Sequence, residues 1–177
     1  MNIPNILTII RLMLIPVMAA FFMTNHILLA LITYVIASIT DVIDGFIARK
    51  FNMITDLGKI LDPVADKLLQ YIALLCLCYI KVIPAWIVIV FLAKEFLLGI
   101  GCIKLIKKDI YISAKWFGKL STCIFFLAII VATLSKLVDS IPPNYPLILM
   151  CFALIIGMFS LVMYILNYLK EIKKPNE

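Results

Sequence analysis

The sequence contains six apolar stretches, each close to the roughly 20 residues that a helix needs to cross a lipid bilayer. Backbone N–H and C=O groups inside a bilayer have to pair within their own segment, so a chain with this pattern is restricted to a bundle of membrane helices. Short polar or proline-containing breaks separate the stretches. We expect helices over residues 6–24, 27–48, 60–80, 83–106, 115–136 and 146–168.

The composition agrees with a membrane location. Hydrophobic residues make up 65% of the chain and charged residues 15%, whereas a soluble domain is nearer half apolar and carries more charge. The five cysteines lie in apolar stretches at spacings that do not suggest a metal site or a disulfide framework. We therefore expect an all-α integral membrane protein with a single domain over residues 1–177.

Lysine and arginine are distributed unevenly between the two sides of the expected bundle. One side carries only Lys81 and Lys136. By the positive-inside rule the richer side is cytoplasmic, so we expect both termini in the cytoplasm. The net charge of +6 suits anionic lipids, and basic residues at membrane edges do not indicate nucleic acid as a partner. The basic residues of the richer side are Arg49, Lys50, Lys59, Lys104, Lys107, Lys108, Lys115, Lys119, Lys170, Lys173 and Lys174.

Four aspartates lie at the expected cytoplasmic ends of the second and third helices. Asp41 and Asp44 are three residues apart, and Asp62 and Asp66 are four apart, so each pair shares one helix face. A carboxylate at membrane depth costs roughly 2.5–3.5 kcal/mol, so the four require a cationic partner. Hard divalent ions with oxygen ligands fit best, and they commonly bind substrate phosphates as well. We expect two divalent cations, with Mg²⁺ as the first choice and Mn²⁺ as the second.

Small residues and one arginine accompany the carboxylates. Gly45 and Ala48 have minimal side chains, which leaves room for a nucleotide against the helix, and the fork of Arg49 suits a phosphate oxygen. Gly58 lies one turn before Asp62. We expect Pro63 in the first turn of its helix, where proline is tolerated.

Other polar residues leave alternatives open. Asn5, Thr8 and Arg11 recur every three residues, so they either line the cytoplasmic pocket or cap and anchor the first helix. Lys94 and Glu95 interrupt an apolar stretch, and such charges usually face a cavity. A divalent-cation transporter would instead place carboxylates near the midplane on several broken helices. Helix caps and salt bridges do not explain four carboxylates at helical spacing with glycines between them.

The motif D-x-x-D-G-x-x-A-R-x8-G-x-x-x-D-x-x-x-D resembles the signature of the CDP-alcohol phosphatidyltransferases. The opening residues 1–16 are similar to the start of the phosphatidylglycerophosphate synthases of bacteria, a branch of this family. The fixed positions of the motif are all present, as Asp41, Asp44, Gly45, Ala48, Arg49, Gly58, Asp62 and Asp66.

The resemblance implies a fold and an activity. The fold is a bundle of six helices that crosses a bacterial-type cell membrane several times. The protein is expected to bind membrane lipids and to form a homodimer. The activity is transfer of a phosphatidyl group from CDP-diacylglycerol to an alcohol at a cytoplasmic active site, with release of CMP. The four aspartates would bind the metals and Asp66 would also act as the general base. The residues implied for binding CDP are Gly45, Ala48, Arg49 and Gly58.

The acceptor implied by the resemblance is glycerol 3-phosphate, whose phosphate requires cationic or hydroxyl partners. One departure bears on this choice, because Gly99, Gly101 and Cys102 stand where the related enzymes tend to have a second arginine. This departure keeps open a cardiolipin synthase of the same family, with phosphatidylglycerol as acceptor. The candidate residues for the acceptor phosphate are Thr8, Arg11, Lys59, Lys94 and Lys119.

Overall fold

The protein is a bundle of six helices in the computed structural model, and the residues described contain no strand. These residues are 3–51, 56–106, 116–138, 140–142 and 144–172, without the side chains of 3, 48–49, 56–57, 59–60, 100–106, 116–119 and 167–172. The helices are α1 (Ile3–Met23), α2 (Ile27–Lys50), α3 (Asp56–Tyr79), α4 (Ala85–Ile106), α5 (Trp116–Leu134) and α6 (Asn144–Ile172).

Each of the six stretches expected from the sequence is a helix, with differences of a few residues at the ends. The largest differences are of four residues: α3 begins at Asp56 rather than near residue 60, and α6 ends at Ile172 rather than near residue 168. The expectation that Pro63 lies in the first turn is therefore wrong, because Pro63 lies inside α3. Its nitrogen has no hydrogen to donate to the carbonyl of residue 59, so the helical ladder is open beside the aspartates.

Three of the helices are long and apolar enough to cross a membrane, by length and composition, within the described residues. They span Pro4–Met23, Ile27–Ile47 and Asn144–Leu166. Most residues of these segments are not buried inside the protein, and their exposed side chains include large apolar ones such as Met13, Ile32 and Ile155. Such an outward-facing apolar surface is suited to lipid rather than to water.

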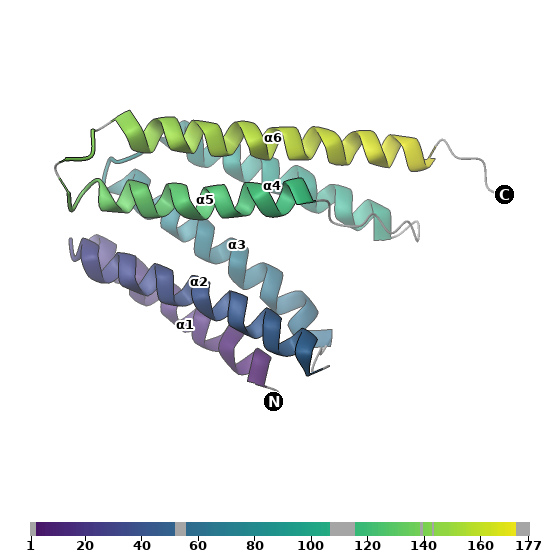
Figure 1. Ribbon diagram of the computed structural model, residues 1–177, viewed down its shortest axis with the longest axis horizontal. Coiled ribbons are helices and arrows are strands. Elements are labelled where there is room, and N and C mark those ends of the chain that lie inside the picture. The colour runs from purple at the N-terminus through teal and green to yellow at the C-terminus, as the bar shows by residue number, and fades with distance from the viewer. Residues whose placement is uncertain (1–2, 52–55, 107–115, 139, 143, 173–177) are drawn as a thin grey trace.

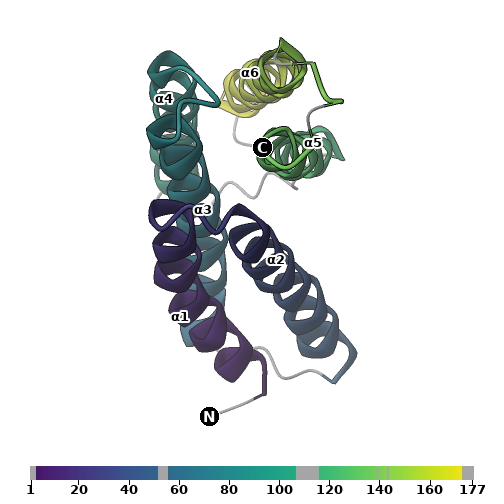
Figure 2. The ribbon, with the colours of Figure 1, turned by 90° about the vertical axis from the view of Figure 1, so that its left-hand side faces the viewer.

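The helices alternate in direction, with α3 at the centre of the bundle (Figures 1 and 2). Helix α1 packs against α2 and α3, helix α6 packs against α4 and α5, and α3 also contacts α2, α4 and α5. The start of α1, the end of α2, the start of α3 and the end of α4 consequently lie towards the same end of the molecule (Figure 1). This end carries all four aspartates of the motif.

Helices α1 and α3 both end in a left-handed residue that reverses the chain. Asn25 has φ 61° and Lys81 has φ 58°. In each case the amide of the next residue donates to a carbonyl five positions earlier, over 2.9 Å. This hydrogen bond closes the helix end, and it allows the following helix to return antiparallel beside the first.

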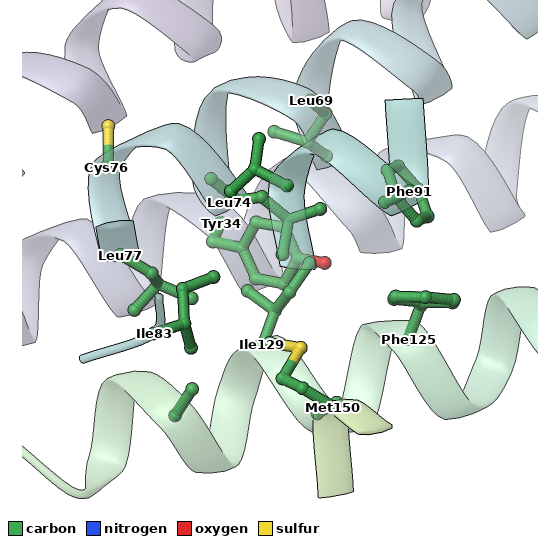
Figure 3. Packing of buried hydrophobic residues seen from close by; sticks show 14 of the residues in the cluster. Tyr34, Leu69, Leu74, Cys76, Leu77, Ile83, Phe91, Phe125, Ile129 and Met150 are labelled. Carbon is green, nitrogen blue, oxygen red and sulfur yellow. The ribbon is translucent and has the colours of Figure 1, made fainter. Parts of the chain in front are cut away.

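The apolar core is built from residues of all six helices. Tyr34, Leu74, Phe91, Phe125 and Met150 come from five different helices and are buried together (Figure 3). The rings of Phe91 and Phe125 lie 4.5 Å apart between centroids. This packing fixes the rotation of α2, α3 and α4, and so determines which of their polar side chains face one another at the aspartate end.

Candidate active site

Arg11 on α1 bridges the two aspartates of α2. Its Nη1 donates to Asp41 Oδ1 and its Nη2 donates to Asp44 Oδ2. The side chain of Arg11 is fully buried, Asp44 is 2% exposed and Asp41 is 39% exposed. The three-residue spacing of the aspartates presents both carboxylates to one guanidinium, whose planar fork suits two acceptors.

Thr8 lies one turn before Arg11 on the same face of α1 and holds the first aspartate of α3. Its hydroxyl donates to Asp62 Oδ1, and it also lies 3.1 Å from the carbonyl oxygen of Pro4. Thr8 is fully buried. Helix α1 therefore contacts carboxylates of both α2 and α3 through two polar side chains at helical spacing.

Asp66 has a different set of partners, which come from its own helix. Gln70 Nε2 donates to Asp66 Oδ1 over 3.2 Å, and Lys67 Nζ lies 3.9 Å from Asp66 Oδ2. The side chain of Asp66 remains 31% exposed. Of the four aspartates it is the one whose partners among the described residues are an amide and an ammonium 3.9 Å away.

A chain of charges continues from Asp66 to α4. Lys67 Nζ lies 3.3 Å from Glu95 Oε2, and Lys94 Nζ lies 2.6 Å from Glu95 Oε1. Glu95 is 10% exposed and Lys94 is 4% exposed. Glu95 thus forms ion pairs with one lysine on each of two helices, so the buried Lys94 has a carboxylate partner inside an apolar stretch.

Lys94 is enclosed by apolar groups and by α6. Its ammonium lies 5.0 Å from the ring centre of Phe91 and 5.3 Å from that of Phe125, within the range of a cation–π contact. A Cβ atom on Gly157 would lie 3.1 Å from both Lys94 Cδ and Ser121 Oγ. The absence of a side chain at Gly157 is what lets Lys94 fit between α4, α5 and α6.

The residues expected at the site are thus divided among distinct groups. Thr8 and Arg11 contact the motif carboxylates, whereas the described contacts link Lys94 to Asp66 through Glu95 and Lys67. Gly58 is buried and Gly45 is half-buried. The remaining expected residues have side chains outside the described part of the chain, and they are Ala48, Arg49, Lys59 and Lys119.

Three contacts were not expected from the sequence. Gln70 holds Asp66, Glu95 joins two lysines, and the Thr8 hydroxyl selects Asp62. A sequence signal exists for Gln70, since it follows Asp66 by four residues and so continues the face of Asp62 and Asp66. The other two contacts join different helices and have no local signal.

This end of the bundle suits a hard cation in its chemistry. Carboxylate oxygens are the donors that Mg²⁺ prefers, and the buried guanidinium of Arg11 already acts as a cation between two of them. In the part of the chain that the structure describes, no three Asp, Glu, His or Cys side chains form a ready ligand set. A metal ion would have to draw carboxylate oxygens away from Arg11 and Thr8.

Comparison with known proteins gives the family. The profile of the CDP-alcohol phosphatidyltransferase family matches residues 1–166. A Bacillus subtilis (strain 168) protein named CDP-diacylglycerol–glycerol-3-phosphate 3-phosphatidyltransferase is 36% identical over 143 residues, which are 72% of this chain and 74% of the relative. A protein of the same name from Aquifex aeolicus (strain VF5) is 34% identical over 132 residues, 73% of this chain and 74% of the relative.

A third relative of that name, from Rickettsia typhi (strain ATCC VR-144 / Wilmington), is more similar over a shorter segment. It is 46% identical over 104 residues, which are 55% of this chain and 57% of the relative. The match thus covers little more than half of the Rickettsia protein. The family profile, by contrast, runs from the first residue through most of α6 and includes every polar residue of the site. The chain belongs to the CDP-alcohol phosphatidyltransferase family.

Proposed function

We propose that this protein is a phosphatidylglycerophosphate synthase, which transfers the phosphatidyl group of CDP-diacylglycerol to glycerol 3-phosphate and releases CMP. The observation that carries the proposal is that relatives of this name match nearly three quarters of the chain. As a member of its family the chain is a membrane-embedded transferase of phospholipid biosynthesis. The alternative, a cardiolipin synthase, is not favoured, since the three relatives named above use glycerol 3-phosphate by name.

The reaction requires two divalent cations, with Mg²⁺ preferred to Mn²⁺. The residues that would hold them are Asp41, Asp44, Asp62 and Asp66, whose oxygens are of the kind that such ions prefer. When bound, the cations would neutralise the charge of the diphosphate that is cleaved. Asp41 and Asp44 already bind one buried cationic side chain, that of Arg11, which supports the proposal that this place favours positive charge.

Asp66 is proposed as the general base. Its carboxylate accepts the proton of the acceptor hydroxyl, the acceptor oxygen bonds to the phosphatidyl phosphorus, and the bond to CMP breaks with its electron pair on CMP. The partial exposure of Asp66 supports this role, because a fully enclosed carboxylate could not reach a hydroxyl. Gln70 orients the carboxylate through the oxygen that it contacts.

The substrates are proposed to bind on either side of these carboxylates. Gly45, Ala48, Arg49 and Gly58 form the CDP-binding region. Lys59 and Lys119 are the proposed main partners of the acceptor phosphate. Thr8, Arg11 and Lys94 contribute less in this arrangement, because each is already engaged by a carboxylate. Thr8 contacts Asp62, Arg11 contacts Asp41 and Asp44, and Lys94 contacts Glu95.

The proposed setting is a bacterial cell membrane. All six helices cross it, residues 1–177 form one domain, and both termini and the active site face the cytoplasm, where the acceptor glycerol 3-phosphate is dissolved. Support comes from the excess of lysine and arginine at this end of the bundle. A homodimer is also proposed, on the resemblance to the family alone.

Acceptor choice is tested by measuring release of CMP from CDP-diacylglycerol by the purified protein with Mg²⁺, with glycerol 3-phosphate or phosphatidylglycerol supplied separately. We expect turnover with glycerol 3-phosphate and loss of turnover on chelation of the metal. The product mass, determined by mass spectrometry, identifies the acceptor. Turnover with phosphatidylglycerol alone would instead identify a cardiolipin synthase.

The base is tested with Asp66→Asn, which keeps the shape of the side chain and its contact with Gln70. We expect a loss of turnover of about 100-fold or more, typical of removing a general base, with little change in binding of CDP-diacylglycerol. Lys136→Gln is the control for the loss of a charge elsewhere, because Lys136 is exposed in the turn that follows α5. Full turnover by Asp66→Asn would exclude Asp66 as the base.

A further inference from the structure

The contact of Arg11 with two aspartates has a consequence for the binding of ions. Arg11 is fully buried, and each of its two terminal nitrogens donates a hydrogen bond to a carboxylate of α2. Arginine remains charged at any pH that a protein experiences, and it has no lone pair with which to ligate a metal. Its charge is therefore a permanent part of the site.

This charge is what makes the site tolerable when no ion is bound. Asp44 is 2% exposed, and Arg11 is the only cation that contacts it among the described residues. A buried carboxylate that loses its partner is strongly destabilising, because the attraction that offset its desolvation is lost. Arg11 thus allows Asp41 and Asp44 to be ionised and close together before a metal arrives.

The same charge opposes metal binding. The oxygens that accept from Arg11 are Asp41 Oδ1 and Asp44 Oδ2, and the same two carboxylates are the proposed ligands of the cations. An ion that uses these oxygens has to replace the hydrogen bonds of Arg11. An ion that uses the other oxygens is repelled by a positive charge a few ångströms away. Both routes lower the affinity for the ion.

One feature of Arg11 indicates that its present contacts are replaceable. Its Nε is buried and has no hydrogen-bond partner among the described residues. A buried donor without an acceptor costs free energy, so the guanidinium is not fully satisfied in this arrangement. Moving this side chain therefore costs less free energy than moving a guanidinium whose nitrogens all have hydrogen-bond partners.

We propose that Arg11 is a resident counter-cation of the Asp41–Asp44 pair, which stabilises the metal-free site and is exchanged for a divalent cation when one binds. The proposal rests on the metal site of the proposed function. Arg11 is a positioning residue in this role, since it acts through the two carboxylates. It makes metal binding an exchange of cations rather than the filling of a preformed site.

The test is binding of Mn²⁺ to the full-length protein in detergent, measured by the electron paramagnetic resonance signal of free Mn²⁺, together with thermal unfolding with and without the ion. Arg11→Gln removes the charge. We expect it to bind Mn²⁺ at least about tenfold more tightly, because a repelling unit charge is gone. We also expect it to unfold at lower temperature without metal and to be stabilised by Mn²⁺ more than the natural protein is.

Two further variants keep the test decisive. Arg11→Lys retains the charge but cannot bridge two carboxylates, so it is expected to fold and to bind Mn²⁺ with intermediate affinity. It decides the question if Arg11→Gln does not fold. Lys136→Gln removes an equal charge at an exposed distant position and should leave the Mn²⁺ affinity unchanged.

The outcomes separate this proposal from the proposed function. If the natural protein binds Mn²⁺ and Asp41→Asn weakens the binding, the metal site is present. Unchanged or weaker Mn²⁺ affinity in the folded Arg11 variants would then overturn the counter-cation alone. Failure of the natural protein to bind Mn²⁺ would overturn the metal site, and the role of Arg11 with it.

Discussion

At the scale of single residues, the four aspartates of one motif have different surroundings. Asp44 is enclosed and paired with Arg11, whereas Asp41 shares the same arginine but is well exposed. Asp62 accepts a hydrogen bond from a threonine and Asp66 from a glutamine. Equal positions in a motif therefore do not imply equal contributions to stability, because the cost of a carboxylate depends on its burial and its partner.

Replacing either aspartate that contacts Arg11 should show how much each contributes to stability. We expect Asp44→Ala to lower the free energy of unfolding of the metal-free protein by about 3 kcal/mol, since it breaks a buried pair. Asp41→Ala should cost less, about 1 kcal/mol, because Asp41 is 39% exposed and Arg11 keeps its contact with Asp44. Denaturant or thermal unfolding in detergent measures both. Equal losses would show that exposure does not govern these pairs.

At the scale of elements, α3 and α4 are joined by charges and α6 closes over the junction. Glu95 on α4 contacts Lys67 on α3 and Lys94 on its own helix. Gly157 on α6 leaves the space that Lys94 and Ser121 occupy. The position of Lys67, and through it one contact of Asp66, consequently depends on three helices that lie apart from the motif.

Neutralising Glu95 should disturb this junction. In Glu95→Gln the ammonium of Lys94 loses its carboxylate partner, whereas Lys67 keeps Asp66 at 3.9 Å. Because Lys94 is buried, we expect a loss of about 3 kcal/mol in the free energy of unfolding. Adding Lys94→Met removes that buried charge and should recover much of the loss. Unfolding of the single and double variants measures the coupling. A double variant no more stable than Glu95→Gln would contradict this explanation.

Because α6 approaches Lys94 closely at Gly157, we expect a larger side chain at position 157 to destabilise the protein. Gly157→Val adds atoms where a Cβ would already lie 3.1 Å from Lys94 Cδ, so we expect a loss of about 1–3 kcal/mol from overpacking. Gly99 is the matched control because a Cβ there meets nothing within 4 Å. Gly99→Ala should be neutral or stabilising by up to about 1 kcal/mol through helix propensity. Thermal unfolding distinguishes the two, and a neutral Gly157→Val would show that Lys94 can move aside.

At the scale of the whole molecule, polar and apolar groups are separated along the bundle. Large apolar side chains from five helices are buried together (Figure 3), and the end of α2 and the start of α3, which carry the aspartates, lie towards the same end of the molecule as the start of α1 (Figure 1). The alternating direction of the helices creates this separation, because it brings the end of α2 and the start of α3 together.

The orientation of the bundle in the membrane gives a prediction at this scale. Single cysteines are introduced at Asn25, Lys136 or Lys50 after the five natural cysteines have been replaced by alanine. In intact cells, a maleimide that cannot cross membranes should label positions 25 and 136 but not position 50, since the basic end is expected inside. Labelling at all three positions after lysis is the control. Labelling of position 50 in intact cells would reverse the orientation.

The amino-acid sequence by itself determined the helices and the motif. Apolar length and polar breaks predicted six helices to within a few residues, and helical spacing predicted that each aspartate pair shares a face. Both depend on residues a few positions apart, so they can be derived without the fold. The misplaced start of α3, and with it the position of Pro63, shows that polar residues at a helix end weaken the apolar signal.

Only the tertiary structure decided which partners the charges have. Arg11 was a candidate for the acceptor phosphate, yet in the fold it bridges Asp41 and Asp44, and Lys94 is enclosed beside Gly157. These contacts join helices that are distant in the chain, and they depend on how each helix is rotated about its axis. That rotation is set by packing of the apolar core, where many small contacts act together, and no local pattern in the sequence contains it.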